Sequence, residues 1–378
     1  MQTRRELLGT LGTAGMAALG TQFASTSPPA DQKRDGAKVF RIGVLSARIR
    51  GKPQPLNGHT WHFAQYFHPT INYEAALKHS TPHVVSYYKL SRDPRNSFGV
   101  LPFRDTQITH YYEPDPAIAQ KFADVFPGVE VAKTPEELAK NVDAVWLGDA
   151  SGFGEDHFDM IAPALERGLP TFCDKPIGET IAGVRKILNF AKQHKAPLMS
   201  SSLFRHEWGT EEALRRKTSG EFGELLYVIA SMYGGYSPEG WFVYGQHPAW
   251  MVETICGHGV EAVSAYARNN SCHALVTYPD RMPAEIWYGR PDIAKDYCRT
   301  LVAFQKDRFE FTPAIEGSFT VGHHYEMFNM ANAFRGMIKT GIEPVPHEEI
   351  LEVTAMLYAG AKSMQEKSRL VSLAEVLA

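Results

Sequence analysis

The stretch "GLPTFCDKPIGET", Gly168 to Thr180, decides the fold expected for this chain. Its apolar run ends in Asp-Lys-Pro, and a helical pattern begins at Glu179. A short apolar run that leads into a helix is typical of a buried strand in a parallel sheet. Ligands of such sheets bind at the carboxyl ends of the strands, so the sequence predicts that Lys175 lies at a binding edge.

Pro176 restricts the backbone around Lys175. It fixes its own φ and biases the preceding residue away from helical conformations. A lysine held there donates to a substrate hydroxyl and to a cofactor ribose or carboxamide, and partial desolvation would lower its pKa towards acid–base work. The same residues also fit a surface turn with a solvated lysine, so this motif alone leaves two interpretations open.

Strand-like runs alternate with helical patterns on both sides of this stretch, from Lys38 onward. This alternation predicts an α/β domain with a doubly wound parallel sheet over residues 37–200. The short run "HVVSYY", residues 83–88, is one of the predicted strands. After about Phe222 the strand-like runs follow one another with turns between them. Residues 201–378 are therefore predicted to form an α+β domain with a mostly antiparallel open sheet and two closing helices, at about Glu326–Thr340 and Glu348–Gln365.

Composition excludes several classes of function. The chain has 378 residues and a net charge of −3, so it has no electrostatic footprint for nucleic acid. Its 4 cysteines form no C-x-x-C pair, which argues against a zinc cluster or a disulfide framework. His59 and His62 have H-x-x-H spacing, and His323 adjoins His324, but no carboxylate or thiolate completes a recognisable ligand set. No metal site is predicted.

The N-terminal residues 1–36 are predicted to be an export signal and a linker. Arg4 and Arg5 precede a short apolar run and small residues, an order that resembles a twin-arginine signal. The apolar run is too short for an ordinary membrane span, and no later segment is long and apolar enough for one. We expect a periplasmic protein that spans no membrane after the signal is removed.

Several motifs together resemble the Gfo/Idh/MocA oxidoreductase family. "FCDKPIGET" is similar to its Glu-Lys-Pro motif, with Asp174 in place of Glu. His157 and Gly168 stand where that family has a histidine at a helix start and a glycine before the strand, and "SSSLFRH" is similar to its Phe-Arg segment, which contains Arg205. The resemblance covers nearly everything from Val39 onward.

The resemblance implies a Rossmann-type NAD(P)-binding domain followed by an α+β domain whose open sheet pairs into homo-dimers or homo-tetramers. It implies hydride transfer between nicotinamide and a CH–OH group of a small carbohydrate, that is a sugar, glycoside or cyclitol. The cofactor-binding residues that it implies are Ser46, Ala47, Glu113, Asp149, His157, Asp174, Lys175 and Arg205.

The glycine loop departs from the family pattern. The family has G-x-G-x-x-G straight after the first strand, where glycines let the backbone approach the pyrophosphate. This chain has Ser46 and Ala47 in those places, and Gly51 and Gly58 come only after an insertion. Small residues still allow close approach, and arginines at 48 and 50 offer charge to a phosphate. The alternative is a rebuilt loop that no longer binds dinucleotide.

Glu113 is expected at the end of the second strand, where the family has the residue that contacts the ribose. A carboxylate there accepts hydrogen bonds from both ribose hydroxyls and repels a 2′-phosphate, which favours NAD over NADP. The alternative is a turn residue before Pro114.

The family's second catalytic element is D-x-x-x-H on a helix, and "PAWMVETICGHGVEAVSAY" is assigned to it. His258 then matches the histidine that transfers the hydroxyl proton, and Thr254 stands in the place of the aspartate. Glu253 is adjacent, but it points roughly 100° away on an ideal helix and is not expected to reach. The alternative for His258 is a packed helix histidine.

Three aromatic residues are candidates to line a sugar-binding site. Tyr236, Trp241 and Trp250 lie in "YGGYSPEGWFVYGQHPAW" and are candidate substrate contacts, with core packing or an oligomer interface as the alternative.

Two classes of function follow. The first is an exported NAD-dependent oxidoreductase that retains its cofactor, in which Lys175 and His258 handle protons. The second is a carbohydrate-binding protein without redox activity, or a lyase or hydrolase that uses His258 and Glu253 without nucleotide.

Overall fold

The computed structural model describes residues 38–54, 58–92, 102–149, 152–233, 237–289, 300–311 and 321–378. The predicted signal and linker lie outside these ranges, and so do Tyr236 and the side chains of His323 and His324. Among the described helices, none combines the length and the apolar character that crossing a bilayer requires.

A six-stranded parallel sheet forms the first half of the molecule, in the order β3-β2-β1-β4-β5-β6. The order reverses between β1 and β4, and this switch point is where such sheets bind ligands. The predicted doubly wound sheet is therefore confirmed. The strands are β1 Phe40–Ser46, β2 Thr106–Tyr112, β3 Glu130–Val131, β4 Ala144–Gly148, β5 Thr171–Cys173 and β6 Leu198–Met199.

Short polar side chains start several of the helices that connect these strands. Asp115 caps one helix by accepting from the amide of Ala117 at 2.8 Å, and Thr180 caps another by accepting from Gly183 at 3.0 Å. Such caps satisfy amides that have no partner inside the helix. The helices are α1 His59–Phe67, α2 Tyr73–His79, α3 Pro82–Arg92, α4 Pro116–Val125, α5 Pro135–Asn141, α6 His157–Glu166 and α7 Ile181–His194.

The prediction of a strand at "HVVSYY" is wrong, because these residues belong to α3. β-branched and aromatic residues favour strands locally, but burial here follows helical spacing, with Val84, Tyr88 and Ser91 inside. Arg92 at the end of α3 donates to the carbonyl oxygens of Gln65 and the residue that follows α1, which ties the two helices together.

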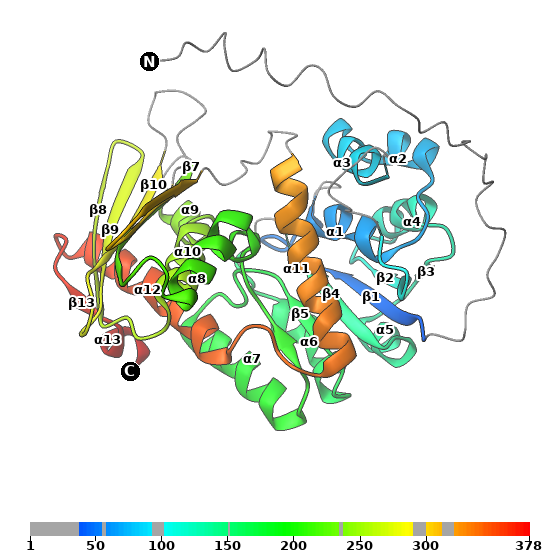
Figure 1. The fold of residues 1–378 in the computed structure, drawn as a ribbon. Helices are drawn as coiled ribbons and strands as arrows, with labels where there is room; N and C mark the ends of the chain where they lie inside the picture. The colour runs from blue at the N-terminus through cyan, green and yellow to red at the C-terminus, as the bar shows by residue number, and fades with distance from the viewer. Residues whose placement is uncertain are drawn as a thin grey trace, which may run out of the picture. The chain divides into compact units, whose positions relative to one another are not determined.

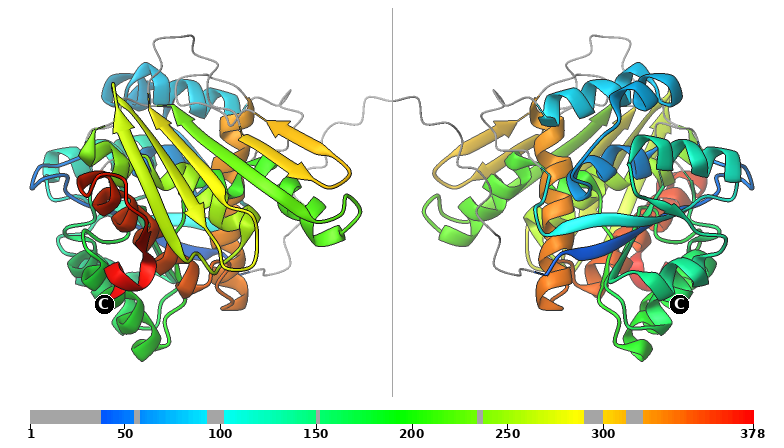
Figure 2. Two further views of the ribbon diagram at one scale, coloured as in Figure 1. Left: turned by 90° about the vertical axis from the view of Figure 1, so that its left-hand side faces the viewer. Right: turned by 90° about the vertical axis from the view of Figure 1, so that its right-hand side faces the viewer.

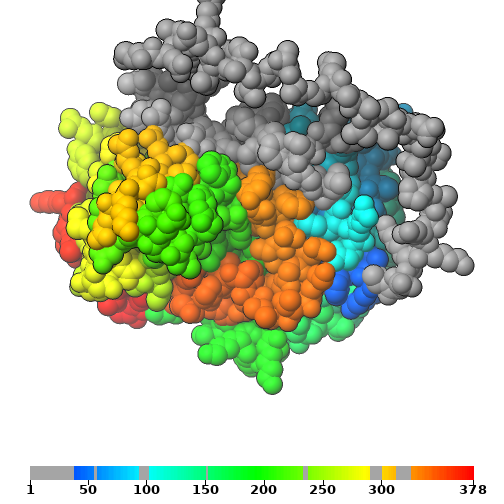
Figure 3. Space-filling view, viewed as in Figure 1, coloured from blue at the N-terminus to red at the C-terminus, as the bar shows by residue number. Residues whose placement is uncertain are grey.

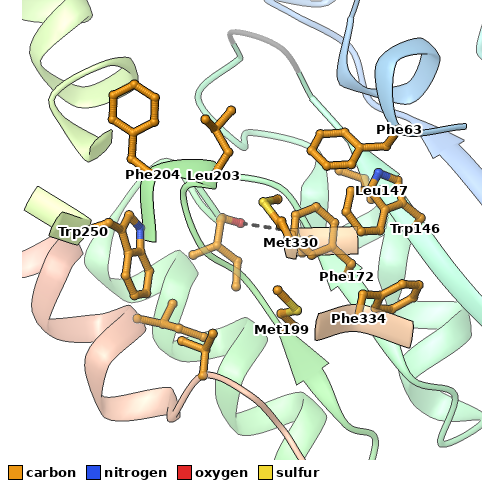
Figure 4. Close-up of a cluster of buried hydrophobic side chains, with 14 of the residues drawn as sticks. Phe63, Trp146, Leu147, Phe172, Met199, Leu203, Phe204, Trp250, Met330 and Phe334 are labelled. Carbon is orange, nitrogen blue, oxygen red and sulfur yellow. Dashed lines mark hydrogen bonds between the residues drawn. The ribbon is translucent and has the colours of Figure 1, made fainter. Parts of the chain in front are cut away.

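Aromatic side chains fill the core between the first sheet and the helices above it. Trp146 of β4 stacks on Phe172 of β5 with ring centroids 3.8 Å apart. Phe63 of α1 and Phe334 lie against the same indole (Figure 4), at 4.7 Å and 5.2 Å. Because Phe334 belongs to a helix near the C-terminus, the first core is completed by the end of the chain.

The second sheet has seven strands in the order β12-β11-β7-β10-β9-β8-β13. All neighbouring pairs are antiparallel except β7 and β10, so the predicted mostly antiparallel sheet is confirmed. It stands apart from the first sheet, with helices between them (Figure 1). The strands are β7 Leu225–Tyr233, β8 Ala262–Arg268, β9 Ser271–Thr277, β10 Ala284–Gly289, β11 Thr300–Phe304, β12 Arg308–Phe311 and β13 Val371–Ser372.

The last long helices link the two sheets, and residues from Val39 to Ala378 form one compact unit. One of these helices starts at Val321, five residues before the predicted start, and lies beside the helix that begins at Trp208 (Figure 3). Its Arg335 donates to both carboxylate oxygens of Asp105 at 2.6 Å. The remaining helices are η1 Leu203–His206, α8 Trp208–Ser219, α9 Pro238–Val243, α10 Gln246–Cys256, α11 Val321–Thr340, α12 His347–Gln365 and α13 Leu373–Leu377.

Candidate active site

Asp174 anchors the segment that follows β5. Its carboxylate is fully buried and accepts from the amides of Lys175 at 2.8 Å and Asp149 at 3.0 Å. The same carboxylate lies 2.5 Å from Nδ1 of His59, at the start of α1. The aspartate therefore joins the ends of β4 and β5 to the start of α1 and fixes the backbone of Lys175. Sequence reasoning missed His59 as its partner, because the two residues are far apart in the chain.

Lys175 is buried rather than solvated, with 2% of its surface exposed. Its Nζ donates to the carbonyl oxygen of Val243 at 3.2 Å and lies 5.5 Å from the centre of the Tyr244 ring. Val243 is the last residue of α9 and Tyr244 follows it, so the lysine spans from the edge of the first sheet to the junction between α9 and α10. The interpretation of this motif as a solvated surface turn is therefore wrong.

His247 stands in the first turn of α10, four residues after Val243. Its Nδ1 lies 2.6 Å from the hydroxyl of Ser202, and its ring packs against Phe204 with centroids 4.8 Å apart. A cavity of about 200 Å³ touches both segments, since Pro176 and Gln246 line it. The structure thus places His247, which the sequence did not assign to the site, four residues after the carbonyl that Lys175 contacts.

His258 lies at the other end of α10. The helix ends at Cys256, and Gly257 follows with a φ of +86°, so His258 is outside the helix that was expected to carry it. A helix of 11 residues is about 16 Å long, which separates His258 from the Val243 carbonyl that Lys175 contacts. The predicted pairing of Lys175 with His258 in one site is therefore wrong.

Glu253 and Thr254 also belong to this far end of α10. Thr254 donates its hydroxyl to the carbonyl oxygen of Trp250 at 2.6 Å, as helix threonines often do, and is not available to a substrate beside Lys175. Glu253 was not expected to reach His258, yet its Oε1 lies 3.8 Å from Nδ1 of that histidine. Gly257 turns the chain back and brings them together.

The loop after β1 is rebuilt around a glutamine. Ser46, the last residue of β1, and Ala47, which follows it, are both buried. The side-chain amide of Gln54 donates to the carbonyl oxygens of Ala47 at 3.0 Å and Gly148 at 2.9 Å, and so bridges β1 and β4 at the switch point. A Cβ on Gly148 would lie 2.6 Å from the amide nitrogen of Thr60, so the start of α1 packs directly onto the end of β4.

The two arginines of this loop differ in their partners. Arg50 pairs with Glu239 of α9 and lies over the Phe153 ring, so it is not a free phosphate ligand. Arg48 holds the loop through its amide, which donates to Asp156 at 2.9 Å, while its exposed guanidinium makes a 3.5 Å contact with Gly51.

Glu113 directly follows β2, where the sequence predicted it. The residue is buried, and its carboxylate accepts a long bond of 3.4 Å from the amide of Asp115. Burial raises the pKa of Glu113 to about 7, and the nearby Ser46 hydroxyl and Arg48 charge act in the opposite direction. A buried carboxylate at this strand end is an acceptor for hydroxyl groups of a ligand.

Asp149 and His157 stabilise the connection after β4 from inside. Asp149 accepts from the amide of Gly152 at 2.7 Å and lies 3.0 Å from Nε2 of His157. The other ring nitrogen of His157 lies 3.4 Å from the Cys173 sulfur, and the histidine is fully buried. Both ring nitrogens of His157 contact protein groups, so the histidine positions the ends of β4 and β5. The prediction that it contacts a cofactor is therefore not met.

Three further residues were assigned to ligands and serve packing or pairing instead. Arg205 donates to Glu349 at 2.7 Å and lies over the ring of Trp250. Trp250 is buried beside Leu203 and Phe204 (Figure 4). Trp241 donates its indole N–H to the carbonyl oxygen of Leu357 at 2.8 Å and is also buried. Both tryptophans therefore pack in the core, which was the alternative to a substrate contact. Tyr236 lies outside the described residues.

Comparison with known proteins agrees with this geometry. Residues 94–202 match the family model described as "Oxidoreductase family, NAD-binding Rossmann fold". An inositol 2-dehydrogenase from Corynebacterium glutamicum is 32% identical over 124 residues, which are 32% of this chain and 36% of that protein. One from Acidiphilium cryptum is 29% identical over 119 residues, or 31% and 34% of the two chains. The matched segment thus spans about a third of these curated relatives.

Solved structures share the whole fold at low sequence identity. A probable dehydrogenase from Thermotoga maritima has a TM-score of 0.68 and 18% identity, and the alignment covers 89% of this chain and 100% of that chain. The scyllo-inositol dehydrogenase of Lactobacillus casei with bound NAD(H) and scyllo-inositol has a TM-score of 0.66 and 15% identity, with the same coverage. The parallel sheet and the Asp174–Lys175 edge thus agree with the Rossmann fold of the family whose model residues 94–202 match.

Proposed function

We propose that this protein is an NAD-dependent oxidoreductase that acts on a CH–OH group of a cyclitol, sugar or glycoside. The observation that carries the proposal is the buried Lys175 at the carboxyl edge of the first sheet, whose Nζ donates to the carbonyl oxygen of Val243, four residues before His247. The names of the curated relatives support inositols as the first substrates to test.

The residues at the switch point fit a dinucleotide. Glu113 offers a buried carboxylate to the ribose hydroxyls, and its charge favours NAD over NADP. Gly58 caps α1 without a side-chain hydrogen bond, so the first amides of this helix are candidate donors for a pyrophosphate. Ser46 and Ala47 are small enough for the close approach that glycines provide in the usual fingerprint.

Bound nicotinamide supplies the acceptor for the hydride that leaves the CH–OH carbon. Lys175 donates to the substrate oxygen from a position that Asp174 fixes. His247 takes the hydroxyl proton, and its contact with Ser202 holds the ring in one orientation. Burial of both side chains excludes water from the proton transfer.

The test combines cofactor analysis with turnover. The full chain, purified and denatured, is expected to release dinucleotide that mass spectrometry identifies as NAD(H). NADH formation is then followed at 340 nm with myo-inositol, scyllo-inositol and a panel of sugars. Lys175→Met should lower kcat/KM by about 10²–10⁴-fold, since the lysine acts in the proton transfer. Lys192→Met, which changes an exposed lysine of α7, is the matched control and should leave kcat/KM unchanged.

Two outcomes would contradict the proposal. Turnover that survives Lys175→Met would remove the lysine from the chemistry. A chain that releases no dinucleotide and binds neither added NAD nor NADP would favour the carbohydrate-binding or cofactor-free alternative, which sugar-binding titrations would then examine.

We also propose that the protein is exported to the periplasm with its cofactor retained. The support is the order of Arg4, Arg5 and the short apolar run, because a twin-arginine route carries folded proteins. A retained cofactor must return its hydride within each turnover, as in epimerisation or transfer between two sugars. Cell fractionation tests the location, and release and rebinding of NAD during turnover would contradict retention.

A further inference from the structure

Three side chains with metal-ligating atoms gather at the C-terminal end of α10, on the far side of that helix from Lys175. They are Glu253 in the last turn of α10, His258 just beyond it, and Glu352 in α12. One ligand atom from each lies within 4.8 Å of the other two. This cluster is separate from the candidate active site, because α10 lies between them.

Glu253 has no donor of its own. Its side chain is fully buried, and neither carboxylate oxygen accepts a hydrogen bond from any group in the described part of the chain. Burial and the neighbouring Glu352 raise the pKa of Glu253 above its ordinary value. A buried carboxylate without a donor is costly, so such a group normally faces an ion or a proton.

Glu352 and His258 are held so that they face Glu253. Oε1 of Glu352 accepts from the amides of Gly259 at 2.9 Å and Val260 at 3.0 Å, which fixes this carboxylate. Its Oε2 lies 3.0 Å from Nδ1 of His258, and the same nitrogen lies 3.8 Å from Oε1 of Glu253. Ligand atoms about 2.0–2.2 Å from a tetrahedral metal ion lie about 3.3 Å from one another. This value falls between the 3.0 Å and 3.8 Å distances from Nδ1 of His258 to the two carboxylates.

The neighbouring cations do not neutralise Glu253 directly. Lys217 donates to the carbonyl oxygens of Ile255 at 3.0 Å and Cys256 at 2.6 Å, and Arg281 donates to Cys256 at 2.7 Å. Arg205 bonds to Glu349 and Thr254. These groups offset part of the negative charge of the cluster, but none of them donates to the Glu253 carboxylate among the described residues.

We propose that Glu253, His258 and Glu352 bind a divalent transition-metal ion. One imidazole nitrogen and two carboxylate oxygens suit Zn²⁺ best and Mn²⁺ less well, while Mg²⁺ and Ca²⁺ prefer oxygen alone. The side chain of His258 is 51% exposed, so an ion can arrive from solvent and keep water as a further ligand. The ion would join the end of α10 to α12, which come from distant parts of the chain.

Titration of the untagged full chain tests the proposal. After treatment with EDTA and buffer exchange, calorimetry with ZnCl₂, MnCl₂ and MgCl₂ is expected to show one Zn²⁺ site, weaker Mn²⁺ binding and the weakest response to Mg²⁺. Zn²⁺ should also raise Tm, because it binds the folded form. His258→Ala and Glu253→Gln should each weaken Zn²⁺ binding at least tenfold and abolish the rise in Tm.

His273→Ala is the matched control. It removes another half-exposed histidine, whose Nε2 lies 2.9 Å from Glu285 on the second sheet, and it should leave Zn²⁺ binding unchanged. Metal-free circular dichroism confirms that each variant is folded, and Glu253→Gln is nearly isosteric. Equal Zn²⁺ affinity in the wild type and both cluster variants would overturn the proposal. Absence of Zn²⁺ binding in the wild type would also overturn the proposal. A proton shared by Glu253 and Glu352 would then explain the buried carboxylate.

Discussion

Asp174 differs from the family's glutamate by one methylene group, and its surroundings show how the shorter side chain is accommodated. Its carboxylate accepts hydrogen bonds from the backbone amides of Asp149 and Lys175, which lie just beyond the ends of β4 and β5. His59 closes the remaining side. The Asp174 side chain thereby fixes the backbone of Lys175 at the sheet edge.

Glu113 should make dinucleotide binding depend on pH. Its pKa of about 7 means that the carboxylate is ionised above neutrality and protonated below it. Because the charged form accepts more strongly, NAD affinity should fall as pH drops through 7, and Glu113→Gln should weaken NAD binding about tenfold at pH 8. The variant should also discriminate less against NADP. Fluorescence titration with both dinucleotides from pH 6 to 9 measures this, with the exposed Glu130→Gln as the control.

The Glu113 carboxyl group also makes the folding stability depend on pH, and the direction of this dependence follows from its raised pKa. Its pKa is raised in the folded protein, so the folded state binds the proton more tightly than the unfolded chain does. The stability that this proton provides is present below the ordinary pKa of 4.5 and is lost as pH rises to about 7. Glu113→Gln should flatten Tm against pH in this range. A variant with the wild-type pH dependence of both Tm and NAD affinity would show that Glu113 does not titrate there.

At the scale of elements, α10 decides which histidine acts. His247→Ala should lower kcat/KM by at least about 10²-fold, because it removes the group that we propose takes the proton. His258→Ala should leave kcat/KM within about twofold, since a helix of about 16 Å separates it from the lysine. Steady-state kinetics of the two variants with the same substrate measures the difference, and the reverse order of effects would restore His258 as the catalytic histidine.

The sequence predicted the helix segment but not its end. Gly257 and the alternating pattern after Glu261 are the signals that separate helix from strand, and the expected D-x-x-x-H spacing directed attention past them. In the structure Ala262 to Arg268 form β8, so His258 precedes a strand. Gly245 and His247 before the apolar part of α10 were visible in sequence, but the contact of Lys175 with nearby Val243 appears only in the folded chain.

Local propensity also explains why Lys175 and Glu113 were placed correctly while others were not. Glu113 directly follows β2 and Lys175 comes two residues after β5, and the apolar run of each strand ends sharply, so their positions depend on local pattern alone. Gln54, in contrast, joins Ala47 to Gly148 through a loop that carries no such pattern. Contacts that join distant segments, such as Glu352 with Gly259, depend on the tertiary fold and have no signal in a single sequence.

At the scale of the whole molecule, one face of the second sheet carries exposed apolar side chains among the described residues. Residues of β8, β9 and β10 alternate between buried and exposed, and the exposed set includes Tyr266, Leu275 and Trp287. Figure 2 shows these strands from the outer side, away from α10 and α12. An apolar patch on an open sheet is typical of an interface, and we propose that two copies pair through it.

Substitution of that face tests the pairing. The double variant Tyr266→Glu and Leu275→Glu should weaken self-association at least about 100-fold, because burying two charges is costly. Light scattering after size exclusion should show the wild type as a dimer or tetramer and the variant as a monomer. Ile342→Glu, a residue with 71% of its surface exposed after α11, is the control and should keep the wild-type size. A monomeric wild type, or a variant of unchanged size, would contradict the proposal.

The length of α10 has a consequence for how this chain can diverge. The helix keeps the Lys175 and His247 edge and the Glu253, His258 and Glu352 cluster farther apart than the distance over which substitutions usually influence one another. The effect of a mutation at one end of α10 should therefore not depend on which residues stand at the other end. A lineage can lose the cluster and keep its chemistry, or exchange its substrate and keep the cluster, so the two ends can have separate evolutionary histories.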